Sequence, residues 1–377
     1  MKDLVKEYVF QNKQQMFDTL KELCSIPAPS HFEQKRAEYC KNWLEGIGAK
    51  GVYIDEALNV IFPINCENSN EITVFVAHTD TVFPDMEPMP YFDDGEKIHC
   101  PGAADDTASV VVLMMMAKFF VEKNLASKKG IMFVCNSCEE GLGNLKGTRQ
   151  LFNDYSGRIS KFISFDSDLN VIANKCVGSH RYEVEVLTEG GHSFKAFGDD
   201  NAIAKLAEII SNIYKIEVPK LADSRTTYNV GTITGGTSVN TIAQNAKLLC
   251  EYRSDNRECL DIMKAKFEEI FENARSEKVQ VNVKMVGDRP CSFIDDSKIE
   301  ALEKITVPII EDVIGDKVSF GSSSTDCNIP LSLGVPALCV GVNMHEKTHT
   351  REEWVHKESI VLGLEIAIKL GKALTEV

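Results

Sequence analysis

Histidine and carboxylate side chains recur along this chain at positions from which several could bind the same metal ions. They are His78 and Asp80, Asp105, Glu139 and Glu140, Asp166, and His349. Imidazole and carboxylate groups suit hard-to-borderline divalent cations, and no thiolate is needed. Two cations that share a carboxylate would polarise a carbonyl group and lower the pKa of a bound water, while a neighbouring carboxylate moves protons. The implied reaction is hydrolysis of an amide or peptide bond.

The first pair follows an apolar, β-branched run, 72–77, which predicts a buried strand. Side chains at i and i+2 share one face of a strand, so His78 and Asp80 can reach the same point. An isolated His-x-Asp pair is more often a surface turn with two polar residues. That alternative loses weight here because other strands of the chain end in the same way.

Three further apolar runs are predicted to be strands, and potential metal ligands follow each of them. The runs are 130–135, before Glu139 and Glu140; 161–165, before Asp166 and Asp168; and 335–342, before His345 and His349. Asp105 and Asp106 precede the helix-like run 108–122, where the helix dipole favours a carboxylate, although N-capping alone would also explain them. Ligand sites of open parallel sheets lie outside the carboxyl ends of the strands, so we expect these groups to converge at one edge.

The remaining elements predict an α/β fold with a doubly wound, mostly parallel sheet, because strands alternate with helices. Residues 5–25 have helical periodicity, and Ser30 to Glu33 form a capping-box pattern that is expected to open a second helix. The segment 84–103 is rich in Pro, Gly and Asp and is expected to be a loop. The other expected elements are strands at 51–55 and 59–63, a helix at 297–314 that kinks or divides at Pro308, and a C-terminal helix at 355–375.

From residue 179 onward the expected strands and helices follow a different order. The expected order is strand 181–187, helix 199–214, strands 226–234 and 246–253, helix 257–277 and strand 279–286. This β-α-β-β-α-β order is the split βαβ pattern of a ferredoxin-like α+β domain. The sequence therefore predicts a discontinuous metal-binding domain, 1–178 and 290–377, interrupted by an inserted lid or dimerisation domain, 179–289.

Length, charge and composition exclude several classes of protein. A chain of 377 residues favours two domains, and its net charge of −15 argues against binding to nucleic acids or anionic membranes. The N-terminus lacks the apolar core of a signal peptide, and the longest apolar run is too short to span a bilayer, so a cytoplasmic protein is expected. The twelve cysteines are scattered in apolar runs, as buried free thiols are. Cys135-x-x-Cys138 resembles a metal or redox half-site, but no second such pair follows it.

Four motifs, taken in order, resemble the metal-site motifs of the M20 metallopeptidases, which include peptidase T, carboxypeptidase G2-type enzymes and N-acyl-amino-acid deacylases. They are His78-Thr79-Asp80, Gly102-Ala103-Ala104-Asp105, Glu139-Glu140-Gly141 and His349-x-x-x-Glu353. The resemblance spans nearly the whole chain. It implies that His78 and Asp166 bind one zinc ion and Glu140 and His349 another, with Asp105 as the bridge and cobalt or manganese as substitutes. It also implies that Glu139 is the general base and that Asp80 holds the His78 ring in place.

The same resemblance implies substrate-binding residues in the inserted domain. His192, in Gly190-Gly191-His192-Ser193, matches a histidine that stabilises the oxyanion and often reaches the active site of a partner subunit, which implies a homodimer. Asn240, which ends the run 235–240, and Arg253 resemble a clamp for the substrate carboxylate, because arginine binds a carboxylate at two points. An ion pair between Arg253 and Asp255 is the structural alternative. Arg289 is a weaker candidate for the substrate, and Asp326 is expected to support the metal site.

The sequence departs from the family pattern at two places. Asp105-Asp106-Thr107 lacks the lysine that many members carry two positions after the bridging aspartate. Asp166-Ser167-Asp168 replaces the usual Glu-Pro-Thr or Asp-Gly, so Asp168 stays an alternative to Asp166. His345 likewise competes with His349.

The function expected from the sequence is that of a dizinc aminopeptidase or di-/tripeptidase for short peptides with a free C-terminal carboxylate. The alternatives are a deacylase of N-acyl amino acids, which would use the same metal site, and a non-catalytic metal- or peptide-binding relative.

Overall fold

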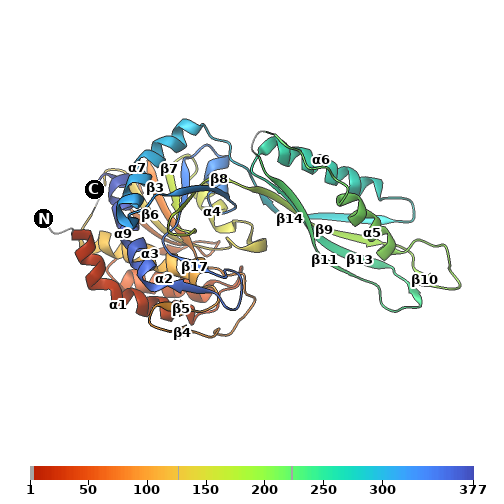
Figure 1. Ribbon diagram of the computed structural model, residues 1–377, viewed down its shortest axis with the longest axis horizontal. Helices are drawn as coiled ribbons and strands as arrows, with labels where there is room; N and C mark the ends of the chain where they lie inside the picture. Colours follow the sequence, from red (N-terminus) through yellow and green to blue (C-terminus); the bar gives the residue numbers. More distant parts are fainter. Residues whose placement is uncertain (1–3, 126, 222–223) are drawn as a thin grey trace. The chain divides into compact units, whose positions relative to one another are not determined.

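The computed structural model describes residues 4–125, 127–221 and 224–377, which form two compact units (Figure 1). Unit 1 comprises Met1–Cys176 and Phe293–Val377, and unit 2 comprises Val177–Ser292. The sequence had placed the corresponding boundaries after residues 178 and 289. Unit 2 is thus an insertion in the chain of unit 1.

The centre of unit 1 is an eight-stranded sheet in the order β1-β2-β6-β3-β7-β16-β8-β15. Its strands are β1 (Tyr53–Ile54), β2 (Val60–Ile64), β6 (Gly130–Asn136), β3 (Ile72–His78), β7 (Ile159–Ser164), β16 (Ala337–Val340), β8 (Val171–Cys176) and β15 (Ser319–Ser323). The four neighbours β6, β3, β7 and β16 are mutually parallel, as are β8 and β15, whereas β1, β2 and the β16–β8 pair add antiparallel contacts. The predicted mostly parallel sheet is confirmed.

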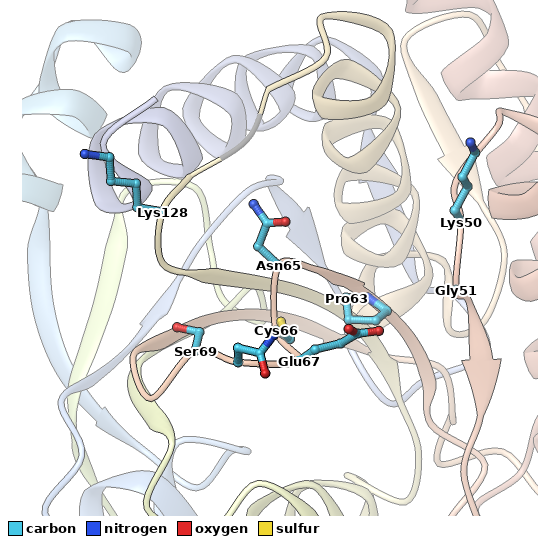
Figure 2. Close-up of a pocket in the computed structure, with 9 residues that line it drawn as sticks. Lys50, Gly51, Pro63, Asn65, Cys66, Glu67, Ser69 and Lys128 are labelled. Atoms are coloured by element: carbon cyan, nitrogen blue, oxygen red, sulfur yellow. The ribbon is translucent and has the colours of Figure 1, made fainter.

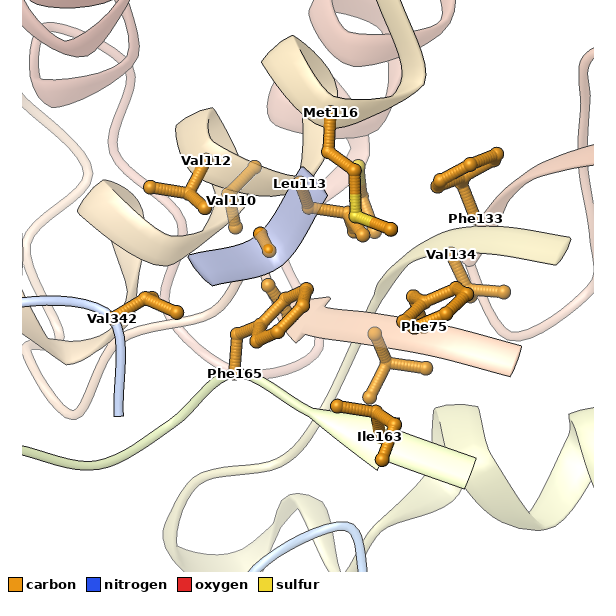
Figure 3. Close-up of a cluster of buried hydrophobic side chains, with 14 of the residues drawn as sticks. Phe75, Val110, Val112, Leu113, Met116, Phe133, Val134, Ile163, Phe165 and Val342 are labelled. Carbon is orange, nitrogen blue, oxygen red and sulfur yellow. The ribbon is translucent and has the colours of Figure 1, made fainter. Parts of the chain in front are cut away.

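Helices surround this sheet. They are α1 (Leu4–Cys24), α2 (Gln34–Gly46), α3 (Ala108–Glu122), α4 (Lys146–Asp154), α7 (Asp296–Ile314), α8 (Asn328–Ser332) and α9 (Lys357–Thr375). Helix α3 contacts β3 and β6 on one side and α1 and α9 on the other, and its side chains are buried almost along its whole length. Figure 3 shows Leu113 and Met116 of α3 above the rings of Phe75, in β3, and of Phe165, which follows β7. Because α3 and every residue of β3 and β6 are buried, the ends of these strands are rigidly placed.

The expectation that the segment 84–103 is a loop was wrong. The segment 84–103 contains the short strands β4 (Phe92–Asp93) and β5 (Lys97–His99), which join β17 (His345–Glu346) and β18 (Trp354–His356) in a four-stranded sheet. Strands of two or three residues are too short to produce a readable apolar period. Helix α7 continues through Pro308 rather than dividing there, and the kink expected as the alternative stays a prediction.

Unit 2 contains an antiparallel sheet in the order β11-β13-β9-β14. Its strands are β9 (Gly178–Leu187), β11 (Thr226–Gly235), β13 (Asn245–Ser254) and β14 (Gln280–Arg289). Helices α5 (Ala202–Ile213) and α6 (Arg257–Asn273) pack on one face of it. The chain order β9-α5-β11-β13-α6-β14 is the predicted β-α-β-β-α-β pattern.

All twelve cysteines are buried free thiols, as expected from their apolar surroundings. Cys138 directs its sulfur at Glu33 Oε1, 3.2 Å away, and at His31 Nδ1, 3.3 Å away. Among the described residues no candidate metal-binding group contains a cysteine. Within the same residues, no helix has both the length and the apolar composition needed to cross a bilayer.

Candidate metal centre

The candidate ligands meet beyond the C-terminal ends of β3, β6 and β7. Three groups of side chains each place one ligand atom per residue within 4.8 Å of the others. The groups are His78, Asp105 and Asp166; Asp105, Glu140 and His349; and His78, Glu139 and Glu140. The first two share Asp105. The structure therefore brings the six residues together at the edge of the sheet where the sequence placed them.

Asp105 lies between the two histidines. Its Oδ1 atom is 3.0 Å from Nε2 of His78, and its Oδ2 atom is 3.0 Å from Nε2 of His349. The same nitrogen of His349 is 3.1 Å from Oε1 of Glu140. Each oxygen of Asp105 thus faces a different cluster of ligand atoms, which is the arrangement that a carboxylate bridging two cations requires.

The cluster carries more negative charge than its two histidines balance. Burial, together with the charges of Asp105 and Glu139, raises the pKa of Glu140 to about 7. Burial and the charge of Asp105 also raise the pKa of Asp166 well above its usual range. Hydrogen bonds to Asp105 and Glu140 raise the pKa of His349 to about 10. Cations at this position would relieve the repulsion among the carboxylates, so the donor set fits divalent metal ions.

Asp80 fixes the segment that carries Glu139 and Glu140. Its Oδ1 and Oδ2 atoms accept hydrogen bonds of 2.9 Å from the backbone N–H groups of Glu139 and Glu140 respectively. Nδ1 of His78 lies 3.0 Å from the carbonyl oxygen of Asp80 and 3.4 Å from its Oδ1 atom. Burial opposes ionisation of Asp80, but hydrogen bonds and the charge of His78 lower its pKa overall. Asp80 is therefore a charged anchor for both ends of the site.

The expected capping box is wrong, and its residues support the site instead. Helix α2 begins at Gln34 without a side-chain cap. The hydroxyl of Ser30 donates a 2.7 Å hydrogen bond to Oδ2 of Asp80. The buried Glu33 carboxylate accepts a 3.0 Å hydrogen bond from the backbone N–H of Cys138, next to Glu139. A local pattern of Ser and Glu three residues apart cannot distinguish a helix cap from two long-range contacts.

Two further supporting residues were not recognised from the sequence. Oε1 of Glu353 accepts hydrogen bonds from the backbone N–H groups of Ala104, at 2.9 Å, and Asp105, at 3.2 Å, and so positions the bridging residue. Buried Arg36 donates to the carbonyl oxygen of Thr79 and to the hydroxyl of Thr107, at 2.9 and 3.1 Å. Glu353 was visible only as the end of the His349 motif, and nothing local marks Arg36.

The remaining candidates of unit 1 lie around the cluster. The buried carboxylate of Asp326 accepts hydrogen bonds from Asn136 and Thr148, and burial together with the charge of Glu139 raises its pKa to about 6. His345 and Asp168 face each other, with Nδ1 and Oδ1 3.6 Å apart. Neither belongs to a candidate metal-binding group of the described residues. The geometry thus brings Asp166 and His349 into the groups rather than their two competitors.

The candidate substrate residues of unit 2 form two separate pairs. His192 lies on β10 (Gly191–His192), which pairs with β12 (Thr241–Ile242), and the backbone N–H of Ser193 donates to the carbonyl oxygen of Asn240 at 3.0 Å. Arg253 and Arg289 both lie opposite Ser179 near the start of β9, whereas Asn245, five positions after Asn240, lies opposite Leu187 at the end of β9. The ten residues of β13 span about 30 Å. Asn240 and Arg253 therefore do not form a clamp within one unit 2.

The alternative expected for Arg253, an ion pair with Asp255, was wrong, because Arg253 pairs with a different carboxylate. Nε of Arg253 donates a 2.7 Å hydrogen bond to Oε1 of Glu251, and Nη2 donates to Oε2 at 3.1 Å. Asp255 instead accepts a hydrogen bond of 2.8 Å from the backbone N–H of Arg225. Glu251 and Arg253 share one face of β13, whereas the strand ends at Ser254, so Asp255 lies beyond it.

A surface cavity of about 610 Å³ lies at the opposite end of the parallel strands. Figure 2 shows its polar lining with Lys50 on one side and Lys128 on the other. It contains none of the candidate metal ligands. This cavity is therefore separate from the site described above.

Comparisons with known proteins agree with this architecture. Residues 74–372 match the model of Peptidase family M20/M25/M40. An uncharacterised protein of Bacillus subtilis, YqjE, is 23% identical over 95% of this chain and 98% of its own length. The succinyl-diaminopimelate desuccinylase of Corynebacterium glutamicum is 22% identical over 94% of each chain.

Solved structures resemble the whole chain. A tripeptidase from Staphylococcus aureus has a TM-score of 0.76 at 22% identity and covers 97% of this chain and 99% of its own. A dinuclear metal-binding peptidase from Bacillus subtilis has a TM-score of 0.65 at 15% identity, with 97% and 98% coverage. These likenesses show a shared fold, including an inserted second unit.

Proposed function

The chain belongs to peptidase family M20/M25/M40, and from that premise we propose that it is a dinuclear metal-dependent hydrolase that cleaves short peptides. The observation that carries this proposal is the position of Asp105 between His78 and His349. A carboxylate that only balanced charge would not need both its oxygens aimed at separate groups of ligand atoms.

In this proposal His78 and Asp166 would hold one ion, Glu140 and His349 would hold the other, and Asp105 would contribute to both; two of the three candidate groups support this division. Nitrogen and oxygen donors without thiolate favour zinc, with cobalt or manganese as substitutes. Bound ions would polarise the substrate carbonyl and lower the pKa of a water molecule.

Glu139 is the general base in this proposal. One of its carboxylate oxygens lies within 4.8 Å of a ring nitrogen of His78 and an oxygen of Glu140, so it borders the ligands. Asp80 accepts a hydrogen bond from the backbone N–H of Glu139, which fixes the backbone there and restricts where the Glu139 side chain can point. The Glu139 carboxylate takes a proton from water and passes it to the leaving amine.

The substrate is a short peptide with a free C-terminal carboxylate. Arg253 supplies a guanidinium group for that carboxylate, Arg289 supplies a second guanidinium group for the substrate, and His192 and Asn240 supply polar groups for the carbonyl. The two pairs lie about 30 Å apart within unit 2, at opposite ends of β13. One substrate can contact both pairs only when they come from two copies of the chain, which supports a homodimer.

Removal of the acyl group from an N-acyl amino acid is a second candidate function. The relatives include a desuccinylase, whose name describes that reaction. The same metal ligands would serve, because both reactions hydrolyse an amide.

A hydrolysis screen tests the proposal. Di- and tripeptides are compared with N-acetyl and N-succinyl amino acids, each with zinc, cobalt and manganese supplied. Glu139→Ala should lower turnover about 10²- to 10⁴-fold and leave the metal content nearly unchanged. The exposed Glu352→Ala is the control and should retain activity. Turnover that survives in Glu139→Ala would show that the assigned mechanism is wrong.

A further inference from the structure

The face of the unit 2 sheet that α5 and α6 leave uncovered carries a cluster of arginines. Arg253 of β13 and Arg289 of β14 both lie directly opposite Ser179 of β9, one on each side. Arg181, two residues further along β9, lies opposite Glu251 and Gly287. Directly opposed residues of antiparallel strands point to the same face, so the three guanidinium groups share it.

One carboxylate, that of Glu251, pairs with two arginines of this cluster. Nε of Arg181 is 3.0 Å from Oε2 of Glu251, the same carboxylate that Arg253 binds. Burial lowers the pKa of Arg181, and the charge of Arg289 lowers it further. Asp288 points to the other face, where its Oδ1 atom lies 3.5 Å from Nε2 of His180. Glu251 therefore lies on the same face as the arginines, whereas Asp288 does not.

Ser179 is an independent sign of a ligand. Its side chain is 1% exposed, and its hydroxyl makes no hydrogen bond to any residue in the described part of the chain. Leaving a buried hydroxyl without a partner costs about 1–3 kcal/mol, so most such groups in proteins are paired. The register places this hydroxyl between Arg253 and Arg289. An anionic oxygen bound there would accept a hydrogen bond from it.

Gly287 makes room for Arg181. A Cβ atom at position 287 would lie 3.1 Å from Cδ and 3.3 Å from Cβ of Arg181, which is too close without a shift. The register of β14 against β9 also changes between Met285 and Gly287. Bulges of this kind re-aim side chains beside functional sites. The strand is thus locally shaped around the stem of the arginine.

We propose that Ser179, Arg181 and Arg289 bind a second carboxylate of the substrate beside Arg253, so that the enzyme prefers substrates with two carboxylates. This inference rests on the proposed function, in which Arg253 binds the C-terminal carboxylate. The second carboxylate can come from an acidic C-terminal side chain or from a dicarboxylic acyl group. Both present the planar anion that a guanidinium group binds at two points.

Matched substrates that differ only in charge test this preference. The pairs are Gly-Gly-Glu against Gly-Gly-Gln, and N-succinylalanine against N-succinamylalanine. The wild type should favour the acid of at least one pair by about 10- to 100-fold in kcat/KM, and the favoured pair identifies the source of the carboxylate. Arg181→Gln should reduce that preference to within about 3-fold while the amide substrate is still cleaved. Lys247→Gln, which removes a charge from the same face at the other end of β13, should leave the preference unchanged.

Glutarate binding separates this inference from the proposed function. Isothermal titration calorimetry of the zinc-loaded protein should show weaker binding by about 10-fold or more in Arg181→Gln, and a smaller loss in Ser179→Ala and Gly287→Ala. Thermal melts establish that the variants are folded. If no substrate is cleaved but glutarate binding depends on Arg181, the proposed function fails and the carboxylate site stands. Equal glutarate binding by the wild type and Arg181→Gln, or no preference for acids in the wild type, overturns the inference.

Discussion

Asp80 accepts a 2.9 Å hydrogen bond from the backbone N–H of Glu140, sixty positions further along the chain. The second oxygen of the same carboxylate binds the N–H of Glu139 in the same way. Asp80 follows β3, and the two glutamates follow β6, its parallel neighbour. The ends of two adjacent strands are therefore joined through one buried charge, and this connection places a metal ligand and the proposed base together.

Replacing Asp80 with Asn should weaken metal binding. An amide keeps one acceptor oxygen, but its NH₂ group would face a backbone N–H. We expect zinc affinity to fall by about 10- to 100-fold, as measured by competition with a chromophoric chelator. Ser30→Ala removes only the hydroxyl that binds Asp80 and should cost about 1 kcal/mol of unfolding free energy with a smaller change in affinity. Zinc affinity in Asp80→Asn within twofold of the wild type would contradict the anchoring role.

Glu353 and Glu352 form a natural pair of test and control. Glu353→Ala leaves the N–H groups of Ala104 and Asp105 without their acceptor, whereas Glu352 is exposed. Each unsatisfied buried donor costs about 1–3 kcal/mol, so the loss of the acceptor for both should lower the urea unfolding free energy of Glu353→Ala by about 2–6 kcal/mol. Glu352→Ala should stay within about 0.5 kcal/mol of the wild type. Equal stability of the two variants would remove Glu353 from the account of how Asp105 is positioned.

The metal-free protein should become less stable as the pH rises from 5 to 7.5. The pKa of Glu140 is raised in the folded state to about 7, above its ordinary value of 4.5, so the folded state holds the proton over that window and the unfolded state does not. Its contribution to stability is thus present below pH 4.5 and is lost as the pH rises through 7, on the order of 2 kcal/mol. Urea unfolding of Glu140→Gln should show a smaller decline. A wild-type curve parallel to that of the variant would contradict the charge repulsion inferred for the site.

The core beneath the site should respond strongly to a cavity. Leu113 of α3 is 1% exposed and lies in the cluster of Figure 3. Leu113→Ala should lower the unfolding free energy by about 2–5 kcal/mol, measured with urea. Leu333→Ala, at a position 61% exposed, is the control and should change it by less than about 0.5 kcal/mol. Similar losses for both variants would mean that α3 does not support the strands as described.

The convergence of ligands could be predicted because buried parallel strands are encoded locally. The apolar runs before His78 and Glu139 predict β3 and β6. Parallel strands end at the same edge of a sheet, so the residues that follow them lie close together. The distance between Asn240 and Arg253 could not be read in the same way. Only thirteen positions separate them, but most of that length is extended strand, which carries the chain away by about 3.4 Å per residue.

The long-range hydrogen bonds that hold the site in place could not be predicted from the sequence. Ser30 and Glu33 satisfy the pattern of a helix cap, and only the folded chain shows that their partners are Asp80 and Cys138. Arg36 is one of several charged residues of α2, and its burial depends on elements that lie far away in sequence. Such contacts follow from packing rather than from any local periodicity.

Metal content is the most direct test of the central claim, that Asp105 joins two cation sites at the edge of the sheet. The full chain is loaded with zinc, dialysed against metal-free buffer and analysed by inductively coupled plasma mass spectrometry. The account predicts two zinc ions per chain in the wild type and at most one in Asp105→Ala. A wild type that retains one ion or none, or an Asp105→Ala variant that retains two, would contradict it.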